Sequence, residues 1–302
     1  MEINLIINAD DFGLTESICE GIKKAHLEGI LTSATLLAGA QYSQYAAAIA
    51  RECRGLSVGA HLQLVAGRPV TKDLQKISTL IDENGFFPGN YVEFFKKWHL
   101  GKISPQHIKT ELFNQIRKII SLGINPSHAD SHQHLHMHPG LLPIFTEVLK
   151  DAQIFKLRNP VEPFNLKFHG ILKFSKGNII KTLFFNPVYN IWYKNKIKKS
   201  GLNMPDVFFG QFFSGNMTIE NVMPALEYYK KLIFNGSSEK GKPLVIEMMT
   251  HPGYSAAEYE NIDCCDDDFK KYKWRQEFDM LTSKEVKSFI NDAGIKLVNY
   301  NF

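Results

Sequence analysis

The feature that most constrains the fold of this chain is a repeated alternation of short apolar segments and amphipathic segments. Residues 3–9 are apolar at nearly every position, which predicts a strand buried on both faces of a parallel sheet. Asp10 and Asp11 end this segment. From Thr15 onward apolar residues recur at helical spacing, and Gly29 fits the C-terminal end of that helix.

The same alternation continues along the chain. We expect further strands at 35–37, 57–62, 127–130, 154–157, 244–249 and 295–298, and further helices at 43–53, 105–122, 139–152 and 283–293. Repeated strand-then-helix units predict an α/β fold with a parallel sheet covered by helices, either doubly wound or closed into a barrel. The length of 302 residues suits two average domains or one α/β barrel, so length alone leaves the domain count open.

One segment, at about 163–205, breaks the alternation and is interpreted as an insertion. It contains no acidic residue and is rich in lysine and aromatic residues. One interpretation is a helical excursion with solvated lysines and aromatic side chains on the core. A cap over the substrate pocket, or a contact in a homodimer, is the alternative. A basic patch for nucleic acid is the least favoured.

Composition excludes several classes of protein. The net charge of +4 is too small to indicate a nucleic-acid-binding protein. No segment approaches the roughly 18 consecutive apolar residues of a membrane span, and the N-terminus does not resemble a signal peptide. The cysteines form no CxxC pair and are interpreted as reduced thiols: Cys19, Cys53, Cys264 and Cys265. We therefore expect a cytoplasmic protein without a membrane span.

Polar residues follow several predicted strands, where the ligand sites of parallel α/β folds form. Asp10 and Asp11 are adjacent, so their side chains diverge, and one can bind a metal while the other accepts a proton. The competing interpretation is an N-cap of the following helix. His61 alone is typical of a core histidine, and it becomes a ligand candidate only if other ligands converge on it. His251 follows the predicted strand at 244–249 and could act as a general acid.

Residues 128–138 hold five of the eleven histidines. In an extended chain, residues of the same parity share one face. Here that face would carry Asp130, His132, His134 and His136. Imidazole and carboxylate ligands suit Zn²⁺, Mn²⁺, Co²⁺ or Ni²⁺. A surface histidine tract is the competing interpretation.

Taken together, four motifs resemble the YdjC-like carbohydrate deacetylases, which include the chitooligosaccharide deacetylases. They lie in the family's order at residues 8–13, 59–62, 128–136 and 247–253. The resemblance implies an irregular, TIM-barrel-like (β/α) barrel that forms a single domain over residues 1–302, with the insertion at 163–205. It also implies one divalent metal ion, Mg²⁺ or Zn²⁺, held by Asp11, His61 and His132.

The resemblance further assigns roles to residues around the metal. Asp10 matches the family's catalytic base, and His251 matches its candidate acid. Arg158 resembles the arginine that follows the next strand, and we expect it to bind substrate. His134 falls outside the implied ligand set.

These features predict a metal-dependent hydrolase that removes acetyl groups from N-acetylated amino sugars or oligosaccharides. Asp10 would deprotonate a water molecule, and His251 would protonate the departing amine. We expect a small carbohydrate as substrate and no nucleic acid partner. A barrel metallo-phosphoesterase is one alternative, and it would need extra ligands such as His134 and His136. A non-catalytic sugar- or metal-binding protein is the other, and it would need neither acid nor base.

Overall fold

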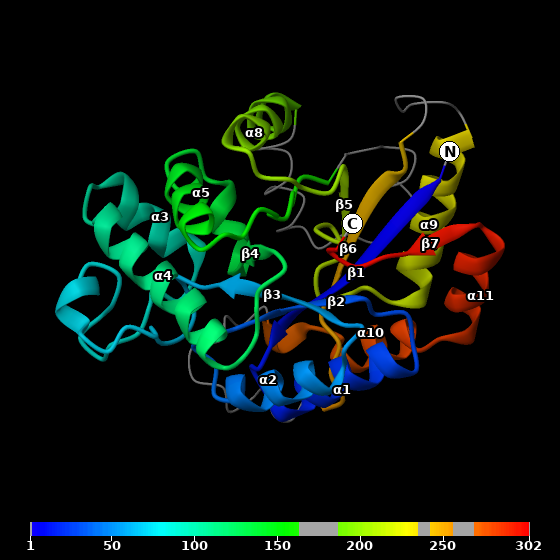
Figure 1. Cartoon of the computed structure of the whole chain (residues 1–302), viewed down its shortest axis with the longest axis horizontal. Coiled ribbons are helices and arrows are strands. Elements are labelled where there is room, and N and C mark those ends of the chain that lie inside the picture. The colour runs from blue at the N-terminus through cyan, green and yellow to red at the C-terminus, as the bar shows by residue number, and fades with distance from the viewer. Residues whose placement is uncertain (1, 163–186, 235–241, 256–268, 302) are drawn as a thin grey trace.

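The structure is a computed structural model that describes residues 2–162, 187–234, 242–255 and 269–301 (Figure 1). The first part of the predicted insertion, residues 163–186, and the cysteines at 264 and 265 lie outside the described residues. No helix in the described ranges combines the length and the apolar composition needed to cross a membrane.

Within the described residues, a curled parallel sheet of seven strands runs through the molecule. Its central strand is β1 (Ile3–Phe12). On one side of β1 lie β6 (Leu244–Thr250) and then β5 (Val207–Phe209). On the other side lie β2 (Ser33–Leu36), β3 (Ser57–Leu62) and β4 (Ala129–Ser131), and β7 (Ile295–Leu297) pairs with the first residues of β1. The predicted α/β fold with a parallel sheet is therefore confirmed.

Two isolated β-bridges continue the pairing beyond β4. Ala129 bridges to Leu157, and Lys156 bridges to Asn203, a few residues before β5. The predicted strand at 154–157 is thus reduced to these bridges, because only two of its residues find partners. The bridges bring the two outer ends of the sheet toward each other.

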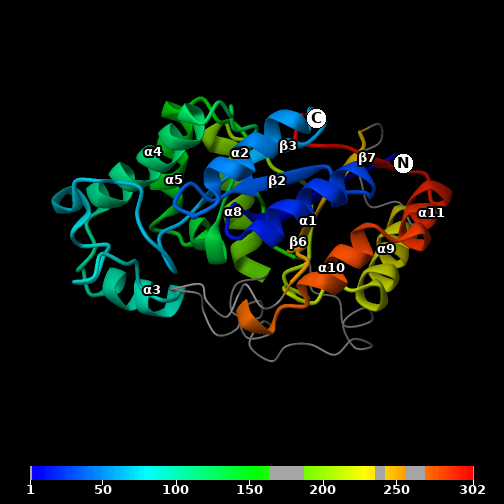
Figure 2. The same ribbon diagram turned by 90° about the horizontal axis from the view of Figure 1, so that it is seen from below.

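Helices pack around the curled sheet (Figures 1 and 2). Thr15 caps the first of them by accepting the Ile18 N–H at 3.1 Å, so this helix begins where the sequence predicts. The helices are α1 (Glu16–Leu27), α2 (Ser43–Glu52), α3 (Tyr91–His99), α4 (Pro105–Ser121), α5 (Leu142–Asp151), α8 (Pro187–Ser200), α9 (Ile219–Phe234), α10 (Trp274–Leu281) and α11 (Lys284–Asp292).

The described part of the predicted insertion, residues 187–205, begins with α8. Its Tyr193 is fully buried, and the Tyr193 hydroxyl donates a hydrogen bond to the Arg158 carbonyl at 3.3 Å. Lys196, Lys198 and Lys199 are exposed. For this helix the arrangement fits the interpretation of an aromatic side chain on the core with lysines in solvent.

A tight contact between β3 and β4 explains a glycine in the motif at 59–62. The His128 ring stacks on Tyr300 with 3.5 Å between ring centroids and an interplanar angle of 5°. A Cβ atom added to Gly59 would lie 2.5 Å from the His128 ring. The ring cannot move away from Gly59 without disturbing the Tyr300 stack, so only glycine fits here.

We expect Gly59→Ala to lower the free energy of unfolding by about 1–3 kcal/mol, because it overpacks this stack. Gly89→Ala is the matched control, since its added Cβ would meet no atom closer than 3.7 Å. The control should change stability by less than about 0.5 kcal/mol. Urea unfolding of both variants measures the difference, and equal values would contradict this account of Gly59.

Candidate active site

A β-bulge at the end of β1 turns its two aspartates in different directions. The register of β1 against β2 shifts between Ala9 and Phe12, and Asp11 has a φ of 62°. The left-handed conformation costs a residue with a side chain about 1–2 kcal/mol, and such strain persists where the surrounding fold requires it. The bulge points Asp10 toward Arg158 and Asp11 toward two histidines.

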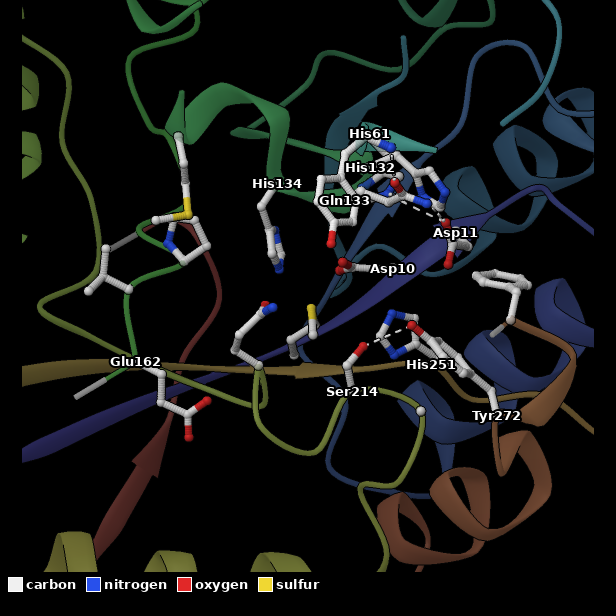
Figure 3. Close-up of a pocket in the computed structure, with 18 of the residues that line it drawn as sticks. Asp10, Asp11, His61, His132, Gln133, His134, Glu162, Ser214, His251 and Tyr272 are labelled. Atoms are coloured by element: carbon white, nitrogen blue, oxygen red, sulfur yellow. Dashed lines mark hydrogen bonds and ion pairs between the residues drawn. The ribbon is translucent and has the colours of Figure 1, made fainter. Parts of the chain in front are cut away.

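Asp11, His61 and His132 bring three ligand atoms together in a nearly equilateral triangle (Figure 3). Asp11 Oδ1 lies 3.4 Å from His61 Nε2 and 3.3 Å from His132 Nδ1. The two imidazole nitrogens are 3.4 Å apart. The three residues come from the ends of β1, β3 and β4, so the strand order places them at one edge of the sheet.

This triangle fits a bound metal ion. Ligands about 2.0–2.1 Å from a tetrahedral ion lie about 3.3–3.4 Å from one another, which matches all three edges. Asp11 Oδ1 is also buried and accepts no hydrogen bond from any described residue. A buried carboxylate oxygen without a donor is costly unless a cation satisfies it.

Asp130 orients His61 from behind. Its Oδ1 lies 2.7 Å from His61 Nδ1, and the Thr35 hydroxyl donates to its Oδ2 at 3.1 Å. Burial lowers the pKa of His61, but the charge and hydrogen bond of Asp130, together with the neighbouring aspartates, raise that pKa to about 9. A carboxylate at Nδ1 fixes the ring so that Nε2 faces the ligand triangle.

Arg158 is fully buried and pairs with three carboxylates. It donates two hydrogen bonds of 2.6 Å to Asp10 and one of 2.7 Å to Glu247, and its Nη1 lies 2.8 Å from Asp130. Burial would raise the pKa of Asp10, but the Arg158 charge and hydrogen bonds outweigh it and hold that pKa well below its usual range. Asp10 is therefore ionised at neutral pH. Asp10 lines the pocket, whereas the Arg158 guanidinium does not.

His251 lies just beyond β6 and is nearly fully buried. Its ring packs edge-on against Tyr272, with 4.9 Å between centroids, and Trp274, with 6.0 Å. Burial lowers the pKa of His251, although Asp10 and Asp11 raise it. Asp10, the ligand triangle and His251 thus line one pocket of about 720 Å³.

The histidine-rich segment does not form the single face that an extended chain would give. The strand ends at Ser131, and Gln133 and His134 adopt left-handed conformations with φ of 53° and 55°. His134 still lines the pocket. His136 is instead buried beside Ser131 and the Arg158 carbonyl, so its predicted place on the ligand face is wrong.

Aromatic and histidine side chains form the pocket wall next to the ligand triangle. Gln133, adjacent to His132, accepts the Tyr91 N–H at 2.8 Å and so attaches the start of α3 to this segment. Phe95 of α3 stacks on His138 with 4.6 Å between centroids. This wall offers flat, uncharged faces of the kind that pack against sugar rings.

Sequence reasoning brought the three ligands, Asp10 and His251 together at one site. It also put Asp130 on the ligand face, whereas the structure places Asp130 behind His61. It gave Thr35 and Glu277 no role. Glu277 interrupts the apolar face of α10 formed by Trp274, Phe278 and Leu281, and a buried acid on such a face is a usable signal. Thr35 gave no signal in the sequence.

Comparisons with known proteins agree on one family. The model of the family described as YdjC-like protein matches residues 4–292. A carbohydrate deacetylase of Thermoanaerobacter pseudethanolicus is 29% identical over 98% of this chain and 98% of that protein, and one of Danio rerio is 30% identical over 98% and 97%. A crystal structure from Enterococcus faecalis, named as a candidate cellobiose-phosphate cleavage protein, superposes with a TM-score of 0.77 at 26% identity, covering 100% of this chain and 98% of that one.

We expect His61→Ala and His132→Ala each to reduce bound metal to a small fraction of the wild-type content, because each removes one corner of the ligand triangle. His134→Ala should have a weaker effect, since His134 lies outside the triangle. His26→Ala, far from the pocket lining, is the matched control. Elemental analysis of folded protein measures the metal, and wild-type content in both ligand variants would refute the assignment.

Glu162 on the pocket wall generates a pH-dependent prediction. Its Oε2 accepts the Gly210 and Phe212 N–H groups at 3.1 Å each, and burial raises its pKa to about 8. Between the ordinary value of 4.5 and about 8, the unfolded chain releases this proton while the folded chain keeps it. The free energy of unfolding therefore falls as pH rises through this range.

Glu162→Gln removes that titration and keeps an oxygen for both N–H groups. Relative to this variant, the wild type should lose stability steadily as pH rises from about 5 to about 8. Urea unfolding at several pH values measures the difference between the two proteins. A difference that does not change with pH would show that Glu162 titrates normally.

Proposed function

Because this chain belongs to the YdjC-like protein family, we propose that it is a metal-dependent carbohydrate deacetylase. It is a hydrolase that cleaves the acetamide C–N bond of an N-acetylated amino sugar and releases acetate. The full-length relatives named carbohydrate deacetylase support this substrate class. The observation that carries the proposal is the ligand triangle of Asp11, His61 and His132, with the ionised Asp10 beside it.

The donor set favours Zn²⁺ as the ion. Two imidazoles and one carboxylate are typical zinc ligands, whereas Mg²⁺ prefers oxygen. An octahedral ion at about 2.1 Å would also need ligand edges near 3.0 Å, which are shorter than the observed 3.3–3.4 Å. When bound, the ion lowers the pKa of a coordinated water and polarises the amide carbonyl.

Asp10 supplies the base. Its carboxylate is ionised and is held by two hydrogen bonds from Arg158 and one of 2.8 Å from Asn8. These donors fix its orientation, so it accepts the proton of the attacking water without reorganisation. Because the same donors make Asp10 a weak base, it can deprotonate only a water molecule whose pKa has been lowered. In this proposal Arg158 contributes to the reaction by holding Asp10 in position.

His251 supplies the acid. As the C–N bond breaks, its electron pair goes to nitrogen, and an imidazole N–H can donate the proton that the amine needs. Tyr272 and Trp274 pack edge-on against the ring at the pocket wall. The curled sheet brings the base and the acid to the carboxyl ends of neighbouring strands β1 and β6, as expected in the irregular (β/α) barrel that we infer from the bridges at Leu157 and Asn203.

The alternative of a multi-metal phosphoesterase has less support. A second group of ligand-type side chains in the described ranges contains Asp10, His61 and Asp130. Arg158 already pairs with both of its carboxylates, and His61 is shared with the first group. A second cation would have to displace this buried guanidinium, which is unfavourable.

The direct test is release of acetate. Protein stripped of metal and reloaded with Zn²⁺, Mn²⁺, Co²⁺ or Mg²⁺ is incubated with N-acetylated mono- and oligosaccharides, and acetate and free amine are measured together. We expect equal amounts of both products, with Zn²⁺ among the most effective ions. Absence of acetate from every sugar and metal combination would overturn the proposed function.

Asp10→Asn and Asp11→Asn should fail in different ways. Asp10→Asn removes the base, so kcat should fall by about a hundredfold or more while bound metal persists. Asp11→Asn should lower metal affinity first, and excess metal should partly restore activity, because asparagine tolerates the left-handed backbone. Metal titration followed by acetate release distinguishes the two, and the reverse pattern would exchange the roles.

A further inference from the structure

Glu277 is a buried carboxyl group that the reaction described above does not use. It lies on α10 and is fully shielded from solvent. Its Oε2 accepts the backbone N–H of His251 at 2.6 Å, and its Oε1 accepts the backbone N–H of Met217 at 3.1 Å. Burial raises the pKa of Glu277 to about 8 despite these two hydrogen bonds. The carboxyl group is thus fixed to the backbone of the very residue that supplies the acid.

The His251 ring lies beside this carboxyl group. His251 Nδ1 is 3.9 Å from Glu277 Oε2. Nδ1 is buried and has no hydrogen-bond partner among the described residues. A buried imidazole nitrogen left in this way costs about 1–3 kcal/mol, and a hydrogen bond to Oε2 would remove that cost if the two groups approached each other by about 1 Å.

We propose that Glu277 is the positioning residue of His251, through a proton that Glu277 Oε2 and His251 Nδ1 share. This inference rests on the proposed deacetylase function. With the shared proton on the Nδ1 side of the ring, the orientation of the ring is fixed, and Nε2 carries a second proton that is available to the substrate. The arrangement follows the general rule that a catalytic imidazole is oriented by a third group.

The protons and electrons of this step balance. As the amide C–N bond breaks and its electron pair moves to nitrogen, the Nε2 proton of His251 forms the new N–H bond. The shared proton then stays on Nδ1, and the carboxylate of Glu277 carries the negative charge. Asp10 has taken one proton from water, and it returns that proton to solvent while His251 recovers one from solvent.

Other charged groups also act on His251. Asp10 and Asp11 raise its pKa, and Arg158 and His61 lower it. In contrast to these four groups, Glu277 is hydrogen-bonded to the His251 backbone and lies within 4 Å of Nδ1. It alone among them can therefore fix the orientation of the ring as well as its charge.

Glu111 provides a matched control. It is a fully buried carboxyl group on α4, and it accepts the Val70 and Thr71 N–H groups at 2.8 and 3.1 Å. It therefore anchors a backbone segment in the same way as Glu277, in a part of the fold that does not line the pocket. Glu111→Gln measures what the loss of such an anchor does by itself.

A double-mutant cycle on acetate release tests the pair. Glu277→Gln should lower kcat by about tenfold or more with KM changed by less than about twofold, and Glu111→Gln should leave kcat within about twofold. In a His251→Ala background, Glu277→Gln should cause no further loss, because the two residues act as a unit. A loss of the same size in both backgrounds, or equal losses for the two glutamine variants, would overturn the proposal.

A second measurement does not depend on activity. Titration of the His251 imidazole by NMR in metal-free protein should show a pKa lower by about one unit or more in Glu277→Gln and unchanged in Glu111→Gln. An unchanged His251 titration would overturn the pairing even in an active deacetylase. A shifted titration in a protein that releases no acetate would instead leave the pairing intact and overturn the proposed function.

A second substitution tests the pairing if the first variant does not fold. If Glu277→Gln does not fold, Glu277→Asp keeps the charge and both acceptor oxygens but withdraws the carboxyl group by one methylene. Like Glu277→Gln, it should lower both kcat and the His251 pKa, whereas Glu111→Asp should lower neither. If Glu277→Asp changes neither quantity, the proposal is wrong.

Discussion

The buried guanidinium of Arg158 is the interaction on which the site depends. A cation placed inside a protein loses several kcal/mol of hydration, and only well-oriented partners compensate that loss. Here the partners are Asp10 on β1, Asp130 on β4 and Glu247 on β6, so one side chain ties together three strands of the sheet. Asp130 in turn orients His61. The positions of Asp10 and His61 are therefore set by the same ion cluster.

The cluster also sets the electrostatics of the pocket. Arg158 contributes one positive charge against several carboxyl groups, and Asp11 adds another carboxylate, whose Oδ1 accepts no hydrogen bond from the described residues. The remaining negative potential raises the pKa of His61 to about 9. A group that binds a proton so tightly is in an environment that favours a cation, and a divalent ion can displace that proton.

Much of this arrangement follows from the sequence, since local patterns fix local structure. The apolar run before Asp10 predicted the central strand, and residues 57–62 were predicted with the bounds that β3 has. The turn at Gln133 and His134 could not be predicted, because nothing in those residue types demands a left-handed backbone. The role of Glu277 also required the tertiary structure, since only the packing of α10 against the end of β6 reveals its two backbone donors.

The pairing of β1 has a consequence for how the chain reaches its native state. Ile3 lies in register with both Leu244 and Ile295, so the central strand is flanked by segments that are synthesised long after it. Contacts so distant in sequence carry a large loop-closure entropy and form slowly. Until β6 arrives, β1 has an unpaired edge and apolar faces, which is the kind of segment that associates with other chains. The strand that carries both aspartates thus needs protection from aggregation in the nascent protein.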